Sequence, residues 1–422
     1  MILPICDTSV VFATSPEWIE GWRQTQSMKT PRAGAAIAQY KNYVYILGGV
    51  DGRQFLSSVE MATLSENAEV LSWRLTTPLP TKLGFMAALV HEGYLYVVGG
   101  GSGPNGKILR REVLRAKIRP DGSLGAWRDQ SPLLLPRRCA KLATHNDRLY
   151  AIGGFGGTLL DSVEVADFTQ SGLGPWKMES EHLIEPRYVH GVKVVGDKIL
   201  ALGGHHQQKG VGINTVEWMS PGSGGSRWVS THPLNQGRYG HGSAFSDNHL
   251  FVFGGISGTE YLNSVEVASV GEKFEIFPFH ETTPLPYPMA NFAVAVYNKH
   301  LLIIGGTTFN DYLNKVLISD VDSKGSIGFW GEKSDRFQPA VAQKSALVNT
   351  GIISELLQTT DYSYIRVTMP SGQEIWLASP VLSAQIGQTI HFSQGVQMSG
   401  FFSKTLKRKF DTILFVSVVQ AE

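Results

Sequence analysis

Short apolar runs that end in a pair of glycines recur along the first three quarters of the chain. In runs such as YVYILGG and HLLIIGG, the first glycine of each pair is Gly48, Gly99, Gly153, Gly203, Gly254 or Gly305. The spacings between these glycines are 51, 54, 50, 51 and 51 residues. A nearly constant period of about 50 residues predicts repeated units, each built from short strands.

Each unit has further landmarks that predict four strands, a to d in chain order. A run of small residues such as AGAAIAQY gives strand a, and the run before the glycine pair gives strand b. Strand c carries a Val-Glu dipeptide in four units, at Val59-Glu60, Val163-Glu164, Val216-Glu217 and Val265-Glu266. Strand d carries an aromatic residue, at Trp73, Trp127, Trp176, Trp228, Phe277 and Trp330. Small residues on strand a suit innermost strands that converge on an axis, so the expected fold is all-β, with a six-bladed β-propeller.

These landmarks resemble kelch repeats, in which an apolar run ends in Gly-Gly and a tryptophan follows downstream. The resemblance covers residues 16–336. Kelch repeats usually have a tyrosine near the end of strand c, whereas this chain has Met61, Ala166 or Ala268 nearby. The sequence is therefore similar to a divergent, bacterial-looking kelch propeller.

Two segments compete to supply the last strand of the ring. Trp22, in WRQTQSMKTPR, fits the strand-d pattern before the first unit, while Trp330, in GSIGFW, fits it after the sixth. Closure by the N-terminal segment is favoured because it interlocks the two ends and removes exposed sheet edges. Local closure by Trp330 stays open as the alternative.

The period stops after Trp330, and residues 337–357 are expected to form a linker. Residues 358–422 contain short β-type runs such as YSYIRVTM, QEIWLASP and FDTILFVSVV, which predict a small β-barrel of five strands. The residues Ile375-Trp376-x-Ala378-x-Pro380 and Ser403-Lys404-Thr405-Leu406 resemble a family of bacterial envelope proteins with an OB-like β-barrel. Some members are encoded beside c-type cytochrome and nitrite-reductase genes, so the resemblance implies a periplasmic location.

The N-terminal residues 1–15 are interpreted as a frayed terminus or the remnant of a signal peptide. Asp7 interrupts their apolar run and no basic residue precedes Arg23, which is a poor match to an export signal. The envelope resemblance leads us to expect a periplasmic or extracellular protein, and the protein would be cytoplasmic if this N-terminus is complete and uncleaved.

Composition excludes several classes of function. The 422 residues hold 37 basic and 36 acidic side chains, a net charge of +1, and no apolar run approaches the roughly 20 residues of a membrane span. General binding of nucleic acid is therefore not expected, and the basic run Lys404, Lys407, Arg408 and Lys409 is interpreted as a solvated hairpin face. With only Cys6 and Cys139, neither a disulfide framework nor a cysteine zinc site is expected. No cofactor and no catalytic residue are predicted.

Four arginines recur at one position of the repeat, sixteen residues before the first glycine: Arg32, Arg137, Arg187 and Arg238. Loops d-to-a and b-to-c lie on the same face of such a ring, so these arginines would form a basic face. Guanidinium groups pair with carboxylates, and kelch adaptors that bind acidic peptides use arginines in this region, so the face is a candidate site for an acidic segment or anionic ligand. The alternative is that each arginine stabilises a turn by bonding loop carbonyls.

Two histidines on neighbouring units, His190 and His241, lie thirteen residues before the first glycine, and His205 and His206 follow the fourth glycine pair on the same face. They complete the candidate ligand-binding set. A metal site would need a third ligand in reach, and a general base would need a carboxylate, for which Glu185 is the nearest candidate. No metal site is predicted.

The sequence therefore predicts a non-catalytic scaffold that binds a protein or ligand, such as a subunit or assembly factor of a bacterial envelope redox complex. A protein partner is expected, for example a cytochrome-containing complex. The alternative is a carbohydrate-active kelch enzyme of the sialate mutarotase type, which would need an acid and a base converging on a sugar-sized pocket.

Overall fold

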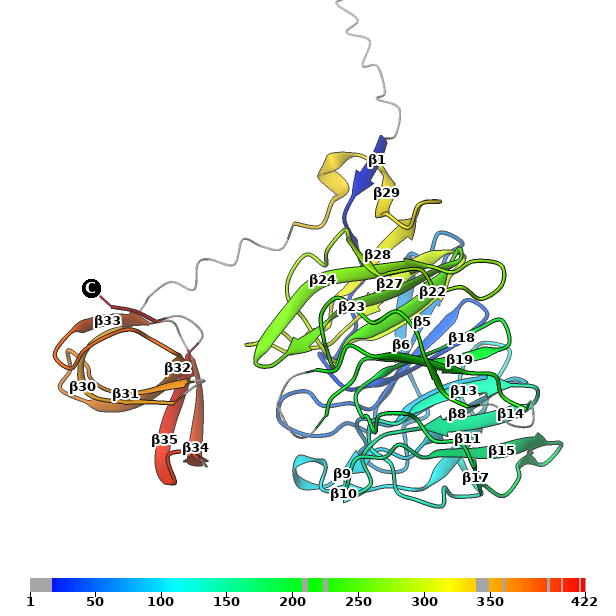
Figure 1. The fold of residues 1–422 in the computed structure, drawn as a ribbon, viewed down its shortest axis with the longest axis horizontal. Helices are drawn as coiled ribbons and strands as arrows, with labels where there is room; N and C mark the ends of the chain where they lie inside the picture. The colour runs from blue at the N-terminus through cyan, green and yellow to red at the C-terminus, as the bar shows by residue number, and fades with distance from the viewer. Residues whose placement is uncertain are drawn as a thin grey trace, which may run out of the picture. The chain divides into compact units, whose positions relative to one another are not determined.

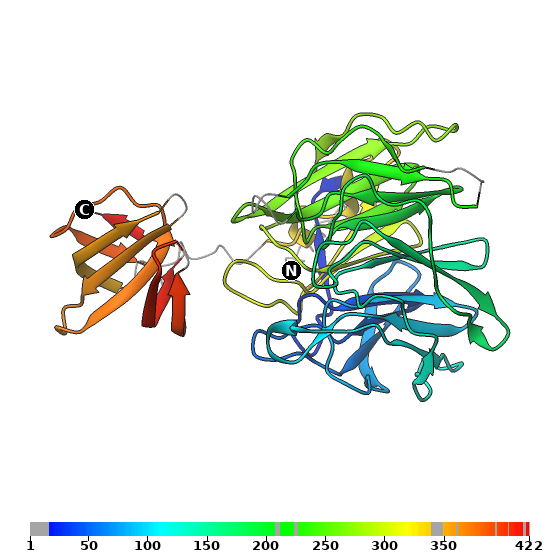
Figure 2. The ribbon, with the colours of Figure 1, turned by 60° about the horizontal axis from the view of Figure 1, so that its bottom comes forward.

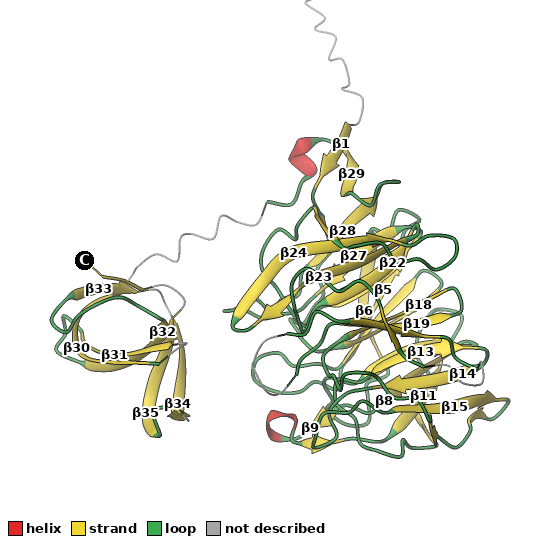
Figure 3. Ribbon diagram, viewed as in Figure 1, coloured by secondary structure: helices red, strands yellow, loops and turns green. Residues whose placement is uncertain are grey.

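A computed structural model describes residues 17–206, 212–222, 227–338, 349–359, 362–392, 395–403, 405–416 and 419–421. The predicted N-terminal remnant and Lys404 lie outside these residues. The chain divides into two compact units, of which one comprises Met1–Gly306 and Leu313–Phe337 and the other has Gln338–Glu422 as its main part. Strands build both units (Figure 3), and the described helices are two short 3₁₀ turns, η1 (Pro104–Gly106) and η2 (Lys333–Asp335). Neither is long or apolar enough to cross a membrane.

The first unit is the predicted six-bladed propeller, and its strands a to d are antiparallel neighbours within each blade. Blade one consists of β3 (Ala36–Tyr40), β4 (Tyr43–Leu47), β5 (Val59–Leu64) and β6 (Val70–Thr76). Blade two consists of β7 (Ala87–His91), β8 (Tyr94–Val98), β11 (Val113–Lys117) and β12 (Arg128–Gln130), and its b-to-c loop carries the hairpin of β9 (Gly101–Ser102) and β10 (Ile108–Leu109). Blade three consists of β13 (Lys141–His145), β14 (Arg148–Ile152), β15 (Val163–Thr169) and β17 (Lys177–Met178), with β16 (Gly172–Leu173) on β15.

The remaining blades repeat this order. Blade four consists of β18 (Gly191–Val195), β19 (Lys198–Leu202), β20 (Val216–Met219) and β21 (Val229–Ser230). Blade five consists of β22 (Gly242–Ser246), β23 (His249–Ser257), β24 (Glu260–Ser269) and β25 (His280–Thr282). Blade six has β26 (Ala293–Tyr297), β27 (His300–Ile304) and β28 (Val316–Val321) as its strands a to c.

The N-terminal segment supplies the outer strand of blade six, as favoured from the sequence. β2 (Arg23–Thr25) pairs with the first half of β28, and β29 (Ile327–Gly331) pairs with the end of β28 and with β1 (Glu17–Glu20). In Figure 1 the blue β1 lies beside the yellow β29. Trp22 is 1% exposed and donates to the Pro284 carbonyl, whereas Trp330 is 66% exposed, so Trp22 occupies the strand-d position of blade six.

Apolar side chains of neighbouring blades pack against each other in six separate clusters, one at each blade interface. At the interface of blades one and two, for example, Tyr45 and Met61 pack with Leu95 and Val97. One predicted aromatic landmark is wrong: Phe277 is 43% exposed, and Phe279, which directly precedes β25, is 5% exposed in the core. Positions two apart fall on the same side of a regular strand, so strand alternation alone could not separate these two phenylalanines, which precede β25.

The glycine pairs end strand b in a conformation that other residues rarely adopt. At Gly48 and Gly49 the backbone φ angles are 55° and 89°. A Cβ atom on Gly48 would lie 2.3 Å from the Leu83 carbonyl oxygen. Both the left-handed backbone and the close approach of the next d-to-a loop therefore require glycine here.

The C-terminal unit is a seven-stranded sheet, shown in orange and red in Figure 2. Its strands are β30 (Asn349–Gln358), β31 (Tyr362–Thr368), β32 (Glu374–Pro380), β33 (Thr389–Phe392), β34 (Gly395–Ser403), β35 (Arg408–Val416) and β36 (Val419–Ala421). Their order is β34-β35-β32-β31-β30-β33-β36, with β32 and β35 parallel. These pairings leave β34 and β36 as end strands, so closure into an OB-like barrel stays a prediction.

The predicted linker 337–357 is wrong in its last part, because β30 begins at Asn349. Ile353, on β30, is 1% exposed and packs with Ile365, Val367 and Phe392. The mixed apolar spacing of this segment hid the strand, because register shifts between Ile353 and Glu355 interrupt its alternation.

Candidate functional site

The four recurring arginines lie at the predicted loop positions, but their side chains are buried. Arg32, Arg137, Arg187 and Arg238 are each 0–1% exposed. Each guanidinium group pairs with the glutamate of the Val-Glu dipeptide on strand c of its own blade, namely Glu60, Glu164, Glu217 and Glu266. An accessible basic face made of these groups is therefore not present in the described structure.

Arg137 illustrates how each pair anchors a turn. Its Nε donates to Glu164 Oε1 over 2.9 Å, and its Nη1 donates to the carbonyls of Gly153 and Ser162 over 2.8 and 2.9 Å. Glu164 also accepts from the backbone N–H groups of Leu134 and Leu135 in the d-to-a loop. Burial lowers the pKa of Arg137, and the neighbouring Glu164 opposes that effect. The geometry is that of the turn-stabilising alternative. A binding role for the four arginines stays a prediction, and their guanidinium groups are buried in the described structure.

The other two blades replace this ion pair by an apolar pair at the same positions. Leu83 and Met289 stand sixteen residues before their first glycines, and the residues after the strand-c valine are Leu114 and Leu317. Leu83 packs with Leu114 in one core cluster, and Met289 packs with Leu317 in another. Arginine and glutamate thus occur together in four blades and are both absent from two.

His190 and His241 occupy equivalent positions on neighbouring blades, as predicted, and both are buried. Burial and the charge of Arg187 lower the pKa of His190 well below its usual value. Burial lowers the pKa of His241 to about 3. The charges of Arg238 and Lys141 also lower this pKa, whereas the Arg238 backbone raises it. Both imidazoles are therefore neutral at physiological pH.

His205 packs against aromatic rings rather than beside other potential metal ligands. Its ring packs edge-on between Tyr188 and Tyr239, with centroid distances of 5.2 and 4.5 Å. His206 is half-buried beside it. Among the described residues, no group of three or more His, Cys, Asp and Glu side chains is arranged to hold a metal ion. Glu185 accepts from the Thr215 hydroxyl over 2.7 Å and lies 3.8 Å from Arg187, rather than pairing with a histidine.

A row of aromatic side chains crosses the face that carries the d-to-a and b-to-c loops. Phe155, Tyr188, His205 and Tyr239 contact one another in sequence, and all are half-buried. The guanidinium of Arg138 lies 5.4 Å from the centre of the Phe155 ring. Backbone bridges between the two kinds of loop hold these residues, joining Arg138 to Phe155 and Tyr188 to His205. This row is called the aromatic face below.

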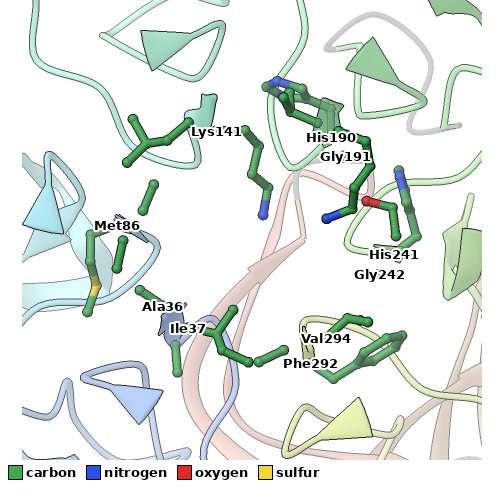
Figure 4. A pocket seen from close by; sticks show the side chains of 18 residues that line it. Ala36, Ile37, Met86, Lys141, His190, Gly191, His241, Gly242, Phe292 and Val294 are labelled. Atoms are coloured by element: carbon green, nitrogen blue, oxygen red, sulfur yellow. The ribbon is translucent and has the colours of Figure 1, made fainter. Parts of the chain in front are cut away.

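The six innermost strands enclose a channel with a cavity of about 250 Å³ (Figure 4). Lys141, His190 and His241 lie on one side of it, and Ile37, Phe292 and Val294 lie on the other. Lys193 also lines the cavity. Burial lowers the pKa of Lys193 to about 8, and the charge of Lys141 adds to that effect.

The two lysines were missed from the sequence, although the repeat marks both. Twelve residues before the first glycine, five blades have Ala36, Ala87, Gly191, Gly242 or Ala293, and blade three has Lys141. Ten residues before it, five blades have Ala38, Leu89, Ala143, Ala244 or Ala295, and blade four has Lys193. A charged residue at a position that is otherwise small or apolar was the available signal.

A circle of backbone hydrogen bonds surrounds the channel at the loop face. The residue fourteen positions before each first glycine has a φ of 53–63° in all six blades: Gly34, Phe85, Cys139, Val189, Gly240 and Asn291. N–H groups of this set donate to the carbonyl of the preceding blade over 2.7–2.9 Å, for instance Phe85 to Gly34 and Gly34 to Asn291. Five of the six links are formed among these described residues, and the link from Val189 to Cys139 is not.

Comparison with known proteins agrees with this architecture. A Kelch motif matches residues 31–61, 136–167 and 237–267. Kelch-like protein 35 of Mus musculus is 28% identical over 204 residues, which are 48% of this chain and 32% of that protein. Kelch-like protein 34 of Homo sapiens is 27% identical over 253 residues, which are 57% of this chain and 37% of that protein. Beta-scruin of Limulus polyphemus is 25% identical over 204 residues, which are 46% of this chain and 22% of that protein.

The chain thus spans only 22–37% of the length of these relatives. The solved structure of YjhT superposes with a TM-score of 0.57 at 15% identity, covering 72% of this chain and 98% of that one, and it supports the fold alone. The blade pattern and the motif matches define the class: the chain contains a kelch-repeat β-propeller. Propellers of this class are commonly protein-binding scaffolds.

Proposed function

We propose that this protein is a non-catalytic scaffold that binds a protein partner through the aromatic face. The observation that carries the proposal is the row Phe155, Tyr188, His205 and Tyr239, with Arg138 at its end. Tyrosine, phenylalanine and arginine are enriched at the centres of protein interfaces, where a few of them supply most of the binding energy.

The frame beneath this row is rigid, which favours recognition. The bridges Arg138–Phe155 and Tyr188–His205 fix the two loops to each other, and the buried Arg–Glu pairs anchor the same d-to-a loops to strand c. Side chains on a preorganised backbone lose little conformational entropy on binding, so more of the contact energy appears as affinity.

The double variant Tyr188→Ala/Tyr239→Ala tests this proposal. Affinity capture with crosslinking from the native organism should identify a partner with the wild-type chain, and the double variant should lose that same partner by roughly tenfold or more in yield, since interface aromatics are typical hot spots. The matched control is Phe277→Ala, an exposed aromatic in a c-to-d loop on the opposite face. Equal capture by all three proteins, with unchanged circular dichroism, contradicts the proposal.

The finer proposal places the scaffold in the bacterial envelope, in the periplasm or outside the cell, as a subunit or assembly factor of a redox complex. It rests on the resemblance of residues such as Trp376 and Ser403 to the envelope family, with the C-terminal unit, proposed as an OB-like barrel, as a second contact to a cytochrome-containing partner. Fractionation of cells that express the tagged natural gene measures the location of the protein. Recovery of the tagged protein only with cytoplasmic markers refutes an envelope role.

The alternative, a carbohydrate-active enzyme of the sialate mutarotase type, has no support from the acid–base pair that the sequence offered. Glu185 is engaged by Thr215 and lies near Arg187. Neither ring nitrogen of His190 or His241 has a carboxylate partner within the described residues. The scaffold therefore remains the function that the geometry supports best.

A further inference from the structure

Two lysines enter the channel at positions where the other blades carry small or apolar residues. Lys141 lies on β13 and Lys193 on β18, and both line the cavity of about 250 Å³. We propose that this cavity is a binding site for a small oxyanion, the carboxylate or phosphate group of a small molecule, held by the two ammonium groups. The site goes beyond the scaffold function, because the aromatic face does not include these residues.

The two amines have no carboxylate to balance them. No aspartate or glutamate is among the described residues that line the cavity. Neither lysine forms an ion pair within the described structure, whereas the four buried arginines each have a glutamate. A cation in a confined space without a counter-charge attracts an anion from solution. Lys141 is exposed to solvent although it lies on an innermost strand, so an ion can reach it.

A neutral imidazole borders the cavity without facing the lysines. His190 is 0% exposed, it lines the same cavity, and both of its ring nitrogens lack a hydrogen-bond partner. Buried polar groups without a partner are rare and costly. The His190 ring packs against Gly153 and points away from the Lys141 amine in Figure 4, so the two lysines alone would hold an oxyanion in the cavity.

The size of the space favours a small molecule over a peptide. A narrower space of about 50 Å³ adjoins the cavity and shares Met86, Lys141 and His241 with it. It is lined by Phe85 and Asn291, whose backbones belong to the circle of hydrogen bonds around the channel. A polypeptide would have to break that circle to enter from this face, while a small oxyanion would not.

Titration calorimetry of the full chain at pH 7 and low ionic strength tests the proposal, with inorganic phosphate in one series and succinate in another. Binding of phosphate alone identifies a phosphate ligand, and binding of succinate alone identifies a carboxylate ligand. Lys141→Ala and Lys193→Ala should each weaken that binding by roughly tenfold or more, because each removes a charge-assisted hydrogen bond. Alanine already stands at the equivalent positions of other blades, so both variants are expected to fold.

The matched control is Lys177→Ala, an exposed lysine on β17 of the same blade as Lys141. It should leave the affinity unchanged, and glycerol should not bind. The affinity for succinate, which is a dianion throughout this range, should also fall as pH rises from 7 to 9, since the pKa of Lys193 is about 8 and Lys141, His190 and His241 are the other titratable groups at the cavity. Absence of binding to both anions at millimolar concentration, or binding that neither variant weakens, overturns the proposal. The variants of the aromatic face leave this measurement untouched, so the two proposals fail separately.

Discussion

The buried arginines and the channel lysines are both cations inside the propeller, yet they differ in their partners. Arg32, Arg137, Arg187 and Arg238 each meet a glutamate and loop carbonyls, whereas Lys141 and Lys193 meet neither. A buried charge is tolerated when it is paired, so the arginines serve the fold. An unpaired charge that faces a cavity costs stability, and such a cost is typical of a binding site.

The blades themselves show two solutions at the position of the buried ion pair. Blade six has Met289 and Leu317 where blade four has Arg187 and Glu217. Both solutions fill the same place, because replacing a buried ion pair by well-packed apolar residues is often neutral or stabilising. The arginine and the glutamate are thus each required for stability only when the other is present.

The largest expected effect comes from breaking one of these pairs. Arg187→Met should lower the free energy of unfolding by about 3–5 kcal/mol, because Glu217 is left buried without its partner. The double variant Arg187→Met/Glu217→Leu, which copies blade six, should recover most of that loss. Urea unfolding followed by tryptophan fluorescence measures both, since every tryptophan except Trp376 lies in the propeller.

Arg148→Ala is the control for this pair, because Arg148 and Asp167 form an ion pair in which both side chains are about half exposed. Its effect should stay within about 0.5 kcal/mol, since exposed ion pairs contribute little. If Arg187→Met has an equally small effect, or if the double variant is as unstable as the single one, the anchoring role is wrong.

A smaller effect of opposite sign is expected at the channel. Lys193→Ala should raise the free energy of unfolding by about 1 kcal/mol at pH 7 in a buffer free of oxyanions, because it removes a charge whose burial lowers its pKa from 10.5 to about 8. The cost of the charged lysine is fully present below pH 8 and disappears as pH rises toward 10.5. The difference in melting temperature between the two proteins should therefore shrink from pH 7 to pH 10.5, and a constant difference contradicts an electrostatic origin.

The sequence predicted where residues lie better than what they contact. The positions of Arg187 on a loop and of His190 and His241 on neighbouring blades followed from counting along the repeat. The burial of Arg187 did not, because its partner Glu217 lies thirty residues away on strand c. The co-occurrence of arginine and Val-Glu in the same four units held that information.

The channel lysines were missed from the sequence for a different reason. A search for clusters of chemical groups looks for residues that recur, whereas Lys141 and Lys193 are single departures from a recurring small residue. The strand β30 was missed because a bulge interrupts its alternation. Regular features are therefore readable from one sequence, and features that interrupt the regularity need the three-dimensional structure.

The circle of hydrogen bonds around the channel also constrains how the propeller is made. Most of its links join neighbouring blades, about fifty positions apart, but the link from Gly34 to Asn291 spans 257 residues. Like the pairing of β2 with β28, it can form only after the ribosome has released nearly all six blades. Contacts between such distant positions slow folding. During synthesis, blade one has no blade-six neighbour until nearly the whole propeller has been translated. We therefore expect blade six and the ring to be closed in a late step of folding, after the last blade has been translated.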